Sequence, residues 1–200
     1  MACKEARFPV VTPANHVAGP RQGEWTYHHY AAIPNEQRYE IIDGVLYIAT
    51  PAHSALHQRS VIRFSCYFYR FVEITGLGIV VPGPIDVELV PHTVVQPDLL
   101  VLLGGLSSDF LSLSHIIGAP DLVVEILEPN TAEHDRGRKY NAYARGGVKE
   151  YWIVDPLINS IEIYVLEAGI YHLLGIFRRE DLLPSRVIKD FPVRVKQFFL

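Results

Sequence analysis

The sequence predicts an α/β protein in which a mixed β-sheet carries flanking helices. Short apolar runs of β type recur along the chain, two segments have helical periodicity, and one helix joins two strands as a crossover over residues 121–154. A chain of 200 residues that is 49% hydrophobic is long enough for one domain with a real core. We therefore expect an irregular lead-in over residues 1–23 and a single domain over residues 24–200.

In the N-terminal half, residues 24–34 form a short predicted helix that Pro34 stops, and residues 39–50 form a hairpin that turns at Asp43-Gly44. A long helix is predicted over 53–76, with a glycine at its end. Its apolar face is expected to hold Leu56, Ser60, Phe64, Tyr67 and Phe71, which recur at steps of three and four. Residues 78–103 predict two or three strands, broken at Pro84 and Pro91.

In the C-terminal half, residues 104–118 are expected to form a loop with one helical turn, and 121–127 a buried strand. Asn130 and Glu133 resemble a capping box, which predicts a helix over 131–145 that ends at Gly146-Gly147. A strand over 148–156 and a hairpin that turns at Ala168-Gly169 follow.

Composition excludes several classes of protein. The net charge of −4 argues against a broad basic surface, so any contact with a polyanion must be local. Cys3 and Cys66 form no metal-type cluster and indicate no disulfide framework, which favours a reducing, cytoplasmic setting. The N-terminus has no apolar stretch of signal-peptide length, and no segment reaches the roughly 20 apolar residues of a membrane span.

Two acids stand where apolar residues are expected. Glu125 interrupts the run Leu122–Leu127, and Asp98 interrupts a second apolar run. An ionised side chain in a buried strand is costly unless a partner compensates it, so acids on two strands predict a shared cation. Acidic oxygen ligands suit Mg²⁺ or Mn²⁺ better than zinc. The predicted second helix adds Lys139, which lies on one face with Asp135 and Tyr143 at steps of four.

These residues carry a resemblance to a known family. "QPD" at 96–98, the Glu125 strand, "EPNT" at 128–131, Lys139 and "GGVKEYWIVDP" occur in an order that resembles the Uma-type putative restriction endonuclease family. This family lies within the PD-(D/E)xK restriction-endonuclease-like superfamily, so the resemblance implies a restriction-endonuclease-like core. It extends from about Tyr39 to Val165, and more weakly to the C-terminus.

The resemblance implies roles for particular residues. Asp98 and Glu125 would hold the metal, with Glu40 as a third acid and the carbonyl of Ile126 as a further ligand. Position 127 is a leucine where the superfamily has its strand lysine, and Lys139 on the following helix matches the place from which this family supplies it. Lys139 would orient the attacking water, help to deprotonate it and offset charge in the transition state.

Two further positions need comment. The resemblance implies that His57 is a polar neighbour of the acids. His53 stands four residues before it, as in zinc sites, but no third soft ligand is near in the sequence, so His53 is interpreted as a surface residue. The family has Ser-Pro-Ser-Thr where this chain has Glu128-Pro-Asn-Thr, and the extra carboxylate of Glu128 either helps a second metal ion or weakens binding of a polyanion.

The leading hypothesis is a Mg²⁺- or Mn²⁺-dependent endonuclease that acts on nucleic acid, with DNA favoured, as a homodimer. Its basic contacts would come from Arg59, Arg63, Arg136 and Arg138. One alternative is a catalytically inactive nucleic-acid-binding or regulatory module that keeps the fold, for which a Lys139 turned to solvent would be evidence. A third is a hydrolase of another phosphate ester or a glycosidase, which a narrow closed pocket would favour.

Overall fold

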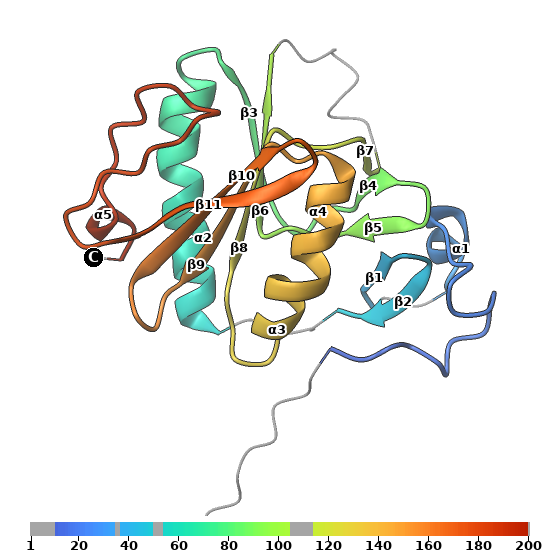
Figure 1. The fold of residues 1–200 in the computed structure, drawn as a ribbon. Helices are drawn as coiled ribbons and strands as arrows, with labels where there is room; N and C mark the ends of the chain where they lie inside the picture. Colours follow the sequence, from blue (N-terminus) through green and yellow to red (C-terminus); the bar gives the residue numbers. More distant parts are fainter. Residues whose placement is uncertain (1–10, 35–36, 50–53, 105–113, 200) are drawn as a thin grey trace, which may run out of the picture.

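The computed structural model describes residues 11–34, 37–49, 54–104 and 114–199 (Figure 1). Six strands form the larger sheet, in the order β11-β10-β9-β8-β6-β3. These strands are β3 (Gly78–Pro82), β6 (Leu99–Leu103), β8 (Leu122–Ile126), β9 (Glu150–Asp155), β10 (Ser160–Glu167) and β11 (Ile170–Arg178). Strands β8 and β9 are parallel and the other neighbours are antiparallel, so the predicted mixed sheet is confirmed.

A second, smaller sheet was not foreseen in the sequence. It has the order β2-β1-β5-β4-β7 and consists of β1 (Tyr39–Ile42), β2 (Val45–Ile48), β4 (Val87–Val90), β5 (Thr93–Val95) and β7 (Ile116–Ile117). Strand β5 pairs with β1 from more than fifty residues away, and local periodicity carries no information about such a pairing. The segment 78–103 therefore holds four strands, divided between the two sheets.

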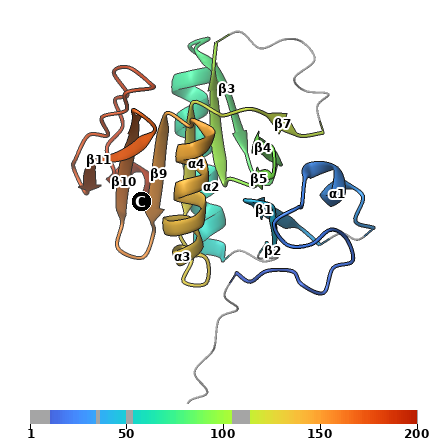
Figure 2. The same ribbon diagram turned by 45° about the vertical axis from the view of Figure 1, so that its right-hand side comes forward.

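Helices cover both faces of the larger sheet (Figures 1 and 2). On one face lie α2 (Ala55–Phe68) and its π-helical continuation η1 (Tyr69–Glu73), which pack Phe64 and Phe68 into a core with Val124 and Trp152. On the other face lie α3 (Ala132–His134), the π-helical turn η3 (Asp135–Lys139) and α4 (Tyr140–Gly146). Because side chains alternate along β8, Glu125 points to the α3–α4 face while Val124 points to α2.

The long helix α2 begins after Ser54, whose hydroxyl accepts the amide N–H of His57 at 3.1 Å. Its buried face is shifted from the expected one: His57, Ser60, Phe64 and Phe68 are buried, whereas Leu56 is 40% exposed. The expectation for Leu56 was wrong because the helix turns His57 toward the sheet, where its ring contacts Asp98.

The second predicted helix is present but is not one regular α-helix. Thr131, not Asn130, occupies the N-cap, and its side chain makes no cap hydrogen bond, so the predicted capping box was wrong. The backbone of Glu128 accepts the N–H groups of Thr131 and Ala132 instead. The π-helical turn at 135–139 interrupts the α-helical ladder, a feature often found at functional sites. The helix ends at Gly147, in the left-handed conformation, close to the predicted end.

The predicted turns and the short N-terminal helix are confirmed, whereas the C-terminal helix was not predicted. Asp43 and Gly44 both have positive φ and close the β1–β2 hairpin, and Ala168-Gly169 closes the β10–β11 hairpin. The helices α1 (Tyr27–Ala31) and α5 (Lys196–Phe199) are short. Residues 11–23 follow an irregular path against the first hairpin, where the amide of Ala14 donates to Leu46. Of the segment 104–118, expected to be a loop with one helical turn, residues 105–113 lie outside the described residues, and Ile116–Ile117 form β7.

In the part of the chain that the structure describes, no helix has the length and apolarity to cross a membrane.

Candidate active site

The predicted site residues converge in a pocket of about 350 Å³ at one end of the larger sheet. Leu99 of β6 lies opposite Val124 of β8, so the antiparallel register places Asp98 opposite Glu125. Glu40 reaches the same pocket from β1 of the smaller sheet, and Lys139 reaches it from η3. The two sheets and the second helical segment thus each contribute one part of the site.

The amine of Lys139 lies among the carboxylates of the pocket. Its Nζ is 2.8 Å from Oε1 of Glu125, 2.9 Å from Oε1 of Glu40 and 3.8 Å from Oδ1 of Asp135. It also lies 3.3 Å from the backbone carbonyl oxygen of Gln96. Only 5% of Lys139 is exposed, so the side chain is turned inward and not to solvent.

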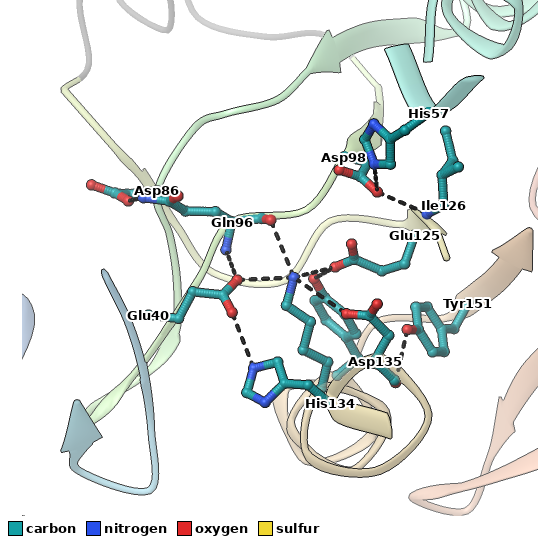
Figure 3. A network of polar contacts seen from close by, with 12 residues as sticks. Glu40, His57, Asp86, Gln96, Asp98, Glu125, Ile126, His134, Asp135 and Tyr151 are labelled. Carbon is teal, nitrogen blue, oxygen red and sulfur yellow. Dashed lines mark hydrogen bonds and ion pairs between the residues drawn. The ribbon is translucent and has the colours of Figure 1, made fainter. Parts of the chain in front are cut away.

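Asp98 forms the second part of the site. Its Oδ2 accepts the amide N–H of Ile126 at 2.7 Å and lies 3.0 Å from Nε2 of His57 (Figure 3). His57 is 2% exposed and comes from the first turn of α2. Two fixed contacts on one oxygen set the orientation of the Asp98 carboxylate toward the pocket that it shares with Glu125.

Other residues that support the site were not all foreseen. His134 lies with its Nε2 3.1 Å from Oε2 of Glu40, while the amide N–H of Gln96 donates to Oε1 of Glu40 at 2.7 Å. Tyr143 donates its hydroxyl to Oε1 of Glu125 at 2.6 Å. The spacing of Asp135, Lys139 and Tyr143 placed these three on one face. Gln96 was noted only as part of the QPD motif and given no role, and nothing in the sequence pointed to His134, because its partner Glu40 is far away along the chain.

Burial and shared charge shift the pKa values of these groups in different directions. Burial alone would raise the pKa of Glu40, but Lys139 and then His134 lower it to about 2. Burial raises the pKa of Glu125 well above its ordinary value; Lys139 opposes this rise and Asp98 adds to it. Burial and Asp98 likewise raise the pKa of Asp135 to about 6 against the effect of Lys139. Three carboxylates lie within 4 Å of the one amine and Asp98 lines the same pocket, so acids outnumber the lysine at this site.

Lys139 itself remains a cation in this arrangement. Burial would lower its pKa, but Glu125, Glu40 and the other acids raise it well above its ordinary value. The expectation that Lys139 helps to deprotonate water is therefore not supported, since a general base must release its proton near working pH. The surroundings of Lys139 allow it to act through its positive charge.

Comparison with known proteins shows the family of the chain. Residues 26–196 match the Uma2 family model, which is described as "Putative restriction endonuclease". The chain belongs to the Uma2 family. A similar solved structure is the crystal structure of a putative nuclease belonging to DUF820 from Anabaena variabilis, with a TM-score of 0.72 and 16% identity. The match covers 88% of this chain and 97% of that one, and at this identity it shows the fold alone. No curated protein matches the chain.

In this Uma2-family chain, the donor set fits a hard divalent cation. Asp98, Glu125 and Glu40 offer carboxylate oxygens, which Mg²⁺ and Mn²⁺ prefer to nitrogen or sulfur. Among the described residues, no three His, Cys, Asp or Glu side chains are already gathered as a metal-binding group. The fit therefore rests on the chemistry of the donors and on their excess negative charge.

Glu128 is not among the described residues that line the pocket, but it lies near the site, where its charge helps to raise the pKa of His57. It is 8% exposed, and its Oε1 accepts the amide N–H of Ser54 at 2.7 Å, so the carboxylate ties the start of α2 to the end of β8. His53, four residues before His57, lies outside the described residues. Asp121 has a structural role: its Oδ2 accepts the amide N–H of Leu103, and its Oδ1 pairs with Lys149 at 2.6 Å.

The four arginines expected to contact nucleic acid differ in their surroundings. Arg136 forms a two-pronged pair with Glu162 at 2.6 and 2.8 Å, so its charge is already matched. Arg138 lies over the ring of Tyr47, 5.1 Å from the ring centre. Arg59 and Arg63 lie on α2, exposed and half-buried respectively. The aromatic residues Tyr151 and Trp152 are fully buried, as expected for core residues.

Proposed function

We propose that this Uma2-family chain is a Mg²⁺- or Mn²⁺-dependent endonuclease that hydrolyses phosphodiester bonds in nucleic acid, with DNA as the favoured substrate. The observation that carries the proposal is that Glu125 of β8 and Glu40 of β1 hold the amine of Lys139 in a pocket that Asp98, just before β6, also lines. A structural ion pair needs one acid for one lysine. This site gathers more carboxylates than the amine can neutralise.

Asp98, Glu125 and Glu40, with the backbone carbonyl of Ile126, are the residues that would hold the metal ion. When bound, the ion would act as a Lewis acid on the scissile phosphate and lower the pKa of a water molecule. His57 orients Asp98 through the 3.0 Å contact, and Tyr143 fixes Glu125 through its hydroxyl. Lys139 supplies a positive charge that stabilises the developing charge on the phosphate.

The inward position of Lys139 bears on the alternative. An inactive nucleic-acid-binding or regulatory module would be free to release this lysine to solvent, whereas here the amine is held by Glu125 and Glu40. Cutting both strands of a duplex requires two active sites, and we propose a two-fold homodimer to supply them. With a net charge of −4, affinity for a polyanion should be weak and strongly salt-dependent.

The test is cleavage by purified protein at low salt in Mg²⁺ or Mn²⁺, with duplex, single-stranded and branched substrates. Glu125→Ala and Lys139→Ala should each lose roughly 2–4 kcal/mol of transition-state stabilisation, as when a charge-stabilising group is removed. Glu133→Ala removes an exposed carboxylate from the same helical segment and should retain wild-type activity. Metal binding without cleavage of any substrate would overturn the endonuclease and favour the inactive module.

A further inference from the structure

The backbone of one residue contacts both Glu40 and Lys139. Gln96 donates its amide N–H to Oε1 of Glu40 at 2.7 Å, and its carbonyl oxygen lies 3.3 Å from Nζ of Lys139. These two groups belong to the peptide units on either side of Gln96, so the backbone dihedral angles of this residue set both contacts. Pro97 follows and disfavours a helical conformation at Gln96, but it does not fix the residue in one orientation.

The side chain of Gln96 extends away from Glu40, toward Asp86 (Figure 3). Its Nε2 donates to Oδ1 of Asp86 at 2.7 Å and to the hydroxyl oxygen of Tyr30 at 3.2 Å. Tyr30 donates its hydroxyl to the same Oδ1 at 3.4 Å, so the three groups form a closed ring of hydrogen bonds. Burial and the Asp86 carboxylate raise the pKa of Tyr30 to about 12, so the hydroxyl keeps the proton that it donates.

The amide nitrogen is the polar atom through which the Gln96 side chain is held. The other one, Oε1, is buried and has no hydrogen-bond partner among the described residues. An amide nitrogen that is bound to a carboxylate and a hydroxyl cannot turn away without losing both bonds, which fixes the orientation of Gln96. Asp86 directly precedes β4 and Tyr30 lies on α1, so the site is tied to the smaller sheet and to the first helix.

We propose that Asp86 and Tyr30 are positioning residues of the site. They hold the side chain of Gln96, and through the Gln96 backbone they keep Glu40 and Lys139 in their places around the pocket. The proposal rests on the metal site proposed above, because Glu40 is one of its ligands. Partners one contact removed from a metal ligand typically change metal affinity by about 10- to 100-fold when they are lost. The alternative is that Asp86 acts only as one more negative charge near a bound cation.

The first readout is the Mn²⁺ affinity of the full chain, measured by calorimetry. Asp86→Ala should weaken binding by about 10-fold, and Tyr30→Phe should weaken it less, because the shorter bond to Asp86 remains. Asp86→Asn keeps an oxygen that accepts both hydrogen bonds but has no charge, so it should bind Mn²⁺ within about twofold of wild type. Gln96→Met should match Asp86→Ala, and combining the two substitutions should add no further loss, since both break the same contact.

The second readout is amide hydrogen exchange of the metal-free protein, followed by NMR. The amide N–H of Gln96 is bound to Glu40 in wild type and should exchange about tenfold faster in Asp86→Ala. The amide N–H of Ile126, which Asp98 accepts at 2.7 Å, should exchange at an unchanged rate and is the reference within the same molecule.

Asp121→Ala is the matched control. It removes another half-buried acid that accepts a backbone N–H, at the end of β8 far from Glu125, and should change neither readout. If Asp86→Ala does not fold, Gln96→Met carries the same test.

Where wild type binds Mn²⁺, an equal affinity of Asp86→Ala would overturn the proposal. An Asp86→Asn variant as weak as Asp86→Ala would also overturn it and assign the effect to charge. Where wild type binds no Mn²⁺, faster exchange of Gln96 in Asp86→Ala would uphold the positioning role and overturn only the metal site, whereas unchanged exchange would overturn both.

Discussion

Replacing Lys139 by methionine removes the central charge of the site and keeps a side chain of similar length. Its cost can be worked from the shift of Glu40. The pKa of Glu40 falls from 4.5 to about 2, and at about 1.36 kcal/mol per pKa unit this favours the folded state by roughly 3 kcal/mol at neutral pH. Lys139 is the largest of the groups that lower this pKa, ahead of His134 and the amide of Gln96, so it supplies a large part of that amount. Glu125 also loses a partner at 2.8 Å, and we expect Lys139→Met to lower the free energy of unfolding by about 3–5 kcal/mol at pH 8.

The same substitution should change the pH dependence of stability. In wild type, the folded-state pKa of Glu40 is depressed, so its contribution is present above pH 4.5 and is lost as the pH falls toward 2. Without the amine, the buried acids should take up protons in the folded state at higher pH than in the unfolded chain. Their raised pKa values favour folding at low pH, and this contribution is lost as the pH rises. The difference between wild type and Lys139→Met should therefore be largest at pH 8 and smaller at pH 5.

Urea unfolding followed by circular dichroism at both pH values is the assay. Lys149→Met is the control, because Lys149 pairs with Asp121 but 69% of its side chain is exposed; it should cost about 0–1 kcal/mol at either pH. Adding Glu125→Gln to Lys139→Met should recover part of the loss, since one buried charge disappears. Unchanged stability of Lys139→Met at pH 8, or an equal loss at pH 5, would refute the reasoning that this amine compensates the buried acids.

Three further outcomes are expected. Mn²⁺ at a hundredfold excess over its Kd should stabilise wild type by about 2.7 kcal/mol and raise its Tm. The Asp98→Ala variant should fold but lose most of this rise in Tm. An equal rise in both proteins would contradict the proposed metal site. Glu128→Ala should lower the free energy of unfolding by about 1–2 kcal/mol, because the contact to Ser54 is lost. The variant should still be stabilised by Mn²⁺, and loss of this stabilisation would contradict the prediction. Tyr143→Phe removes the 2.6 Å hydrogen bond to Glu125 and should lower the free energy of unfolding, measured by thermal unfolding, by about 1–3 kcal/mol. An unchanged stability would show that this hydrogen bond does not stabilise the fold.

The sequence alone determined those features that depend on residues close together along the chain. Asp43-Gly44 and Ala168-Gly169 marked their turns because only a few residues tolerate positive φ. The alternation along residues 122–127 placed Glu125 on one face of its strand and Val124 on the other. The steps of four from Asp135 to Lys139 and Tyr143 placed these side chains on one helical face. An acid within an apolar run also signalled that a compensating partner had to exist.

Only the tertiary structure decided which groups meet. The contact between Glu40 and His134 joins residues 94 positions apart, and the smaller sheet that carries Glu40 comes from a strand pairing that local periodicity does not encode. The backbone carbonyl of Glu128 likewise accepts the N–H groups at the start of the second helix, where the sequence suggested a capping box, and the π-helical turn that contains Lys139 was not foreseen. The physical reason is that periodicity sets only the face on which a side chain lies. The pairing of distant strands sets which faces share one pocket, and therefore how many acids lie close to one amine.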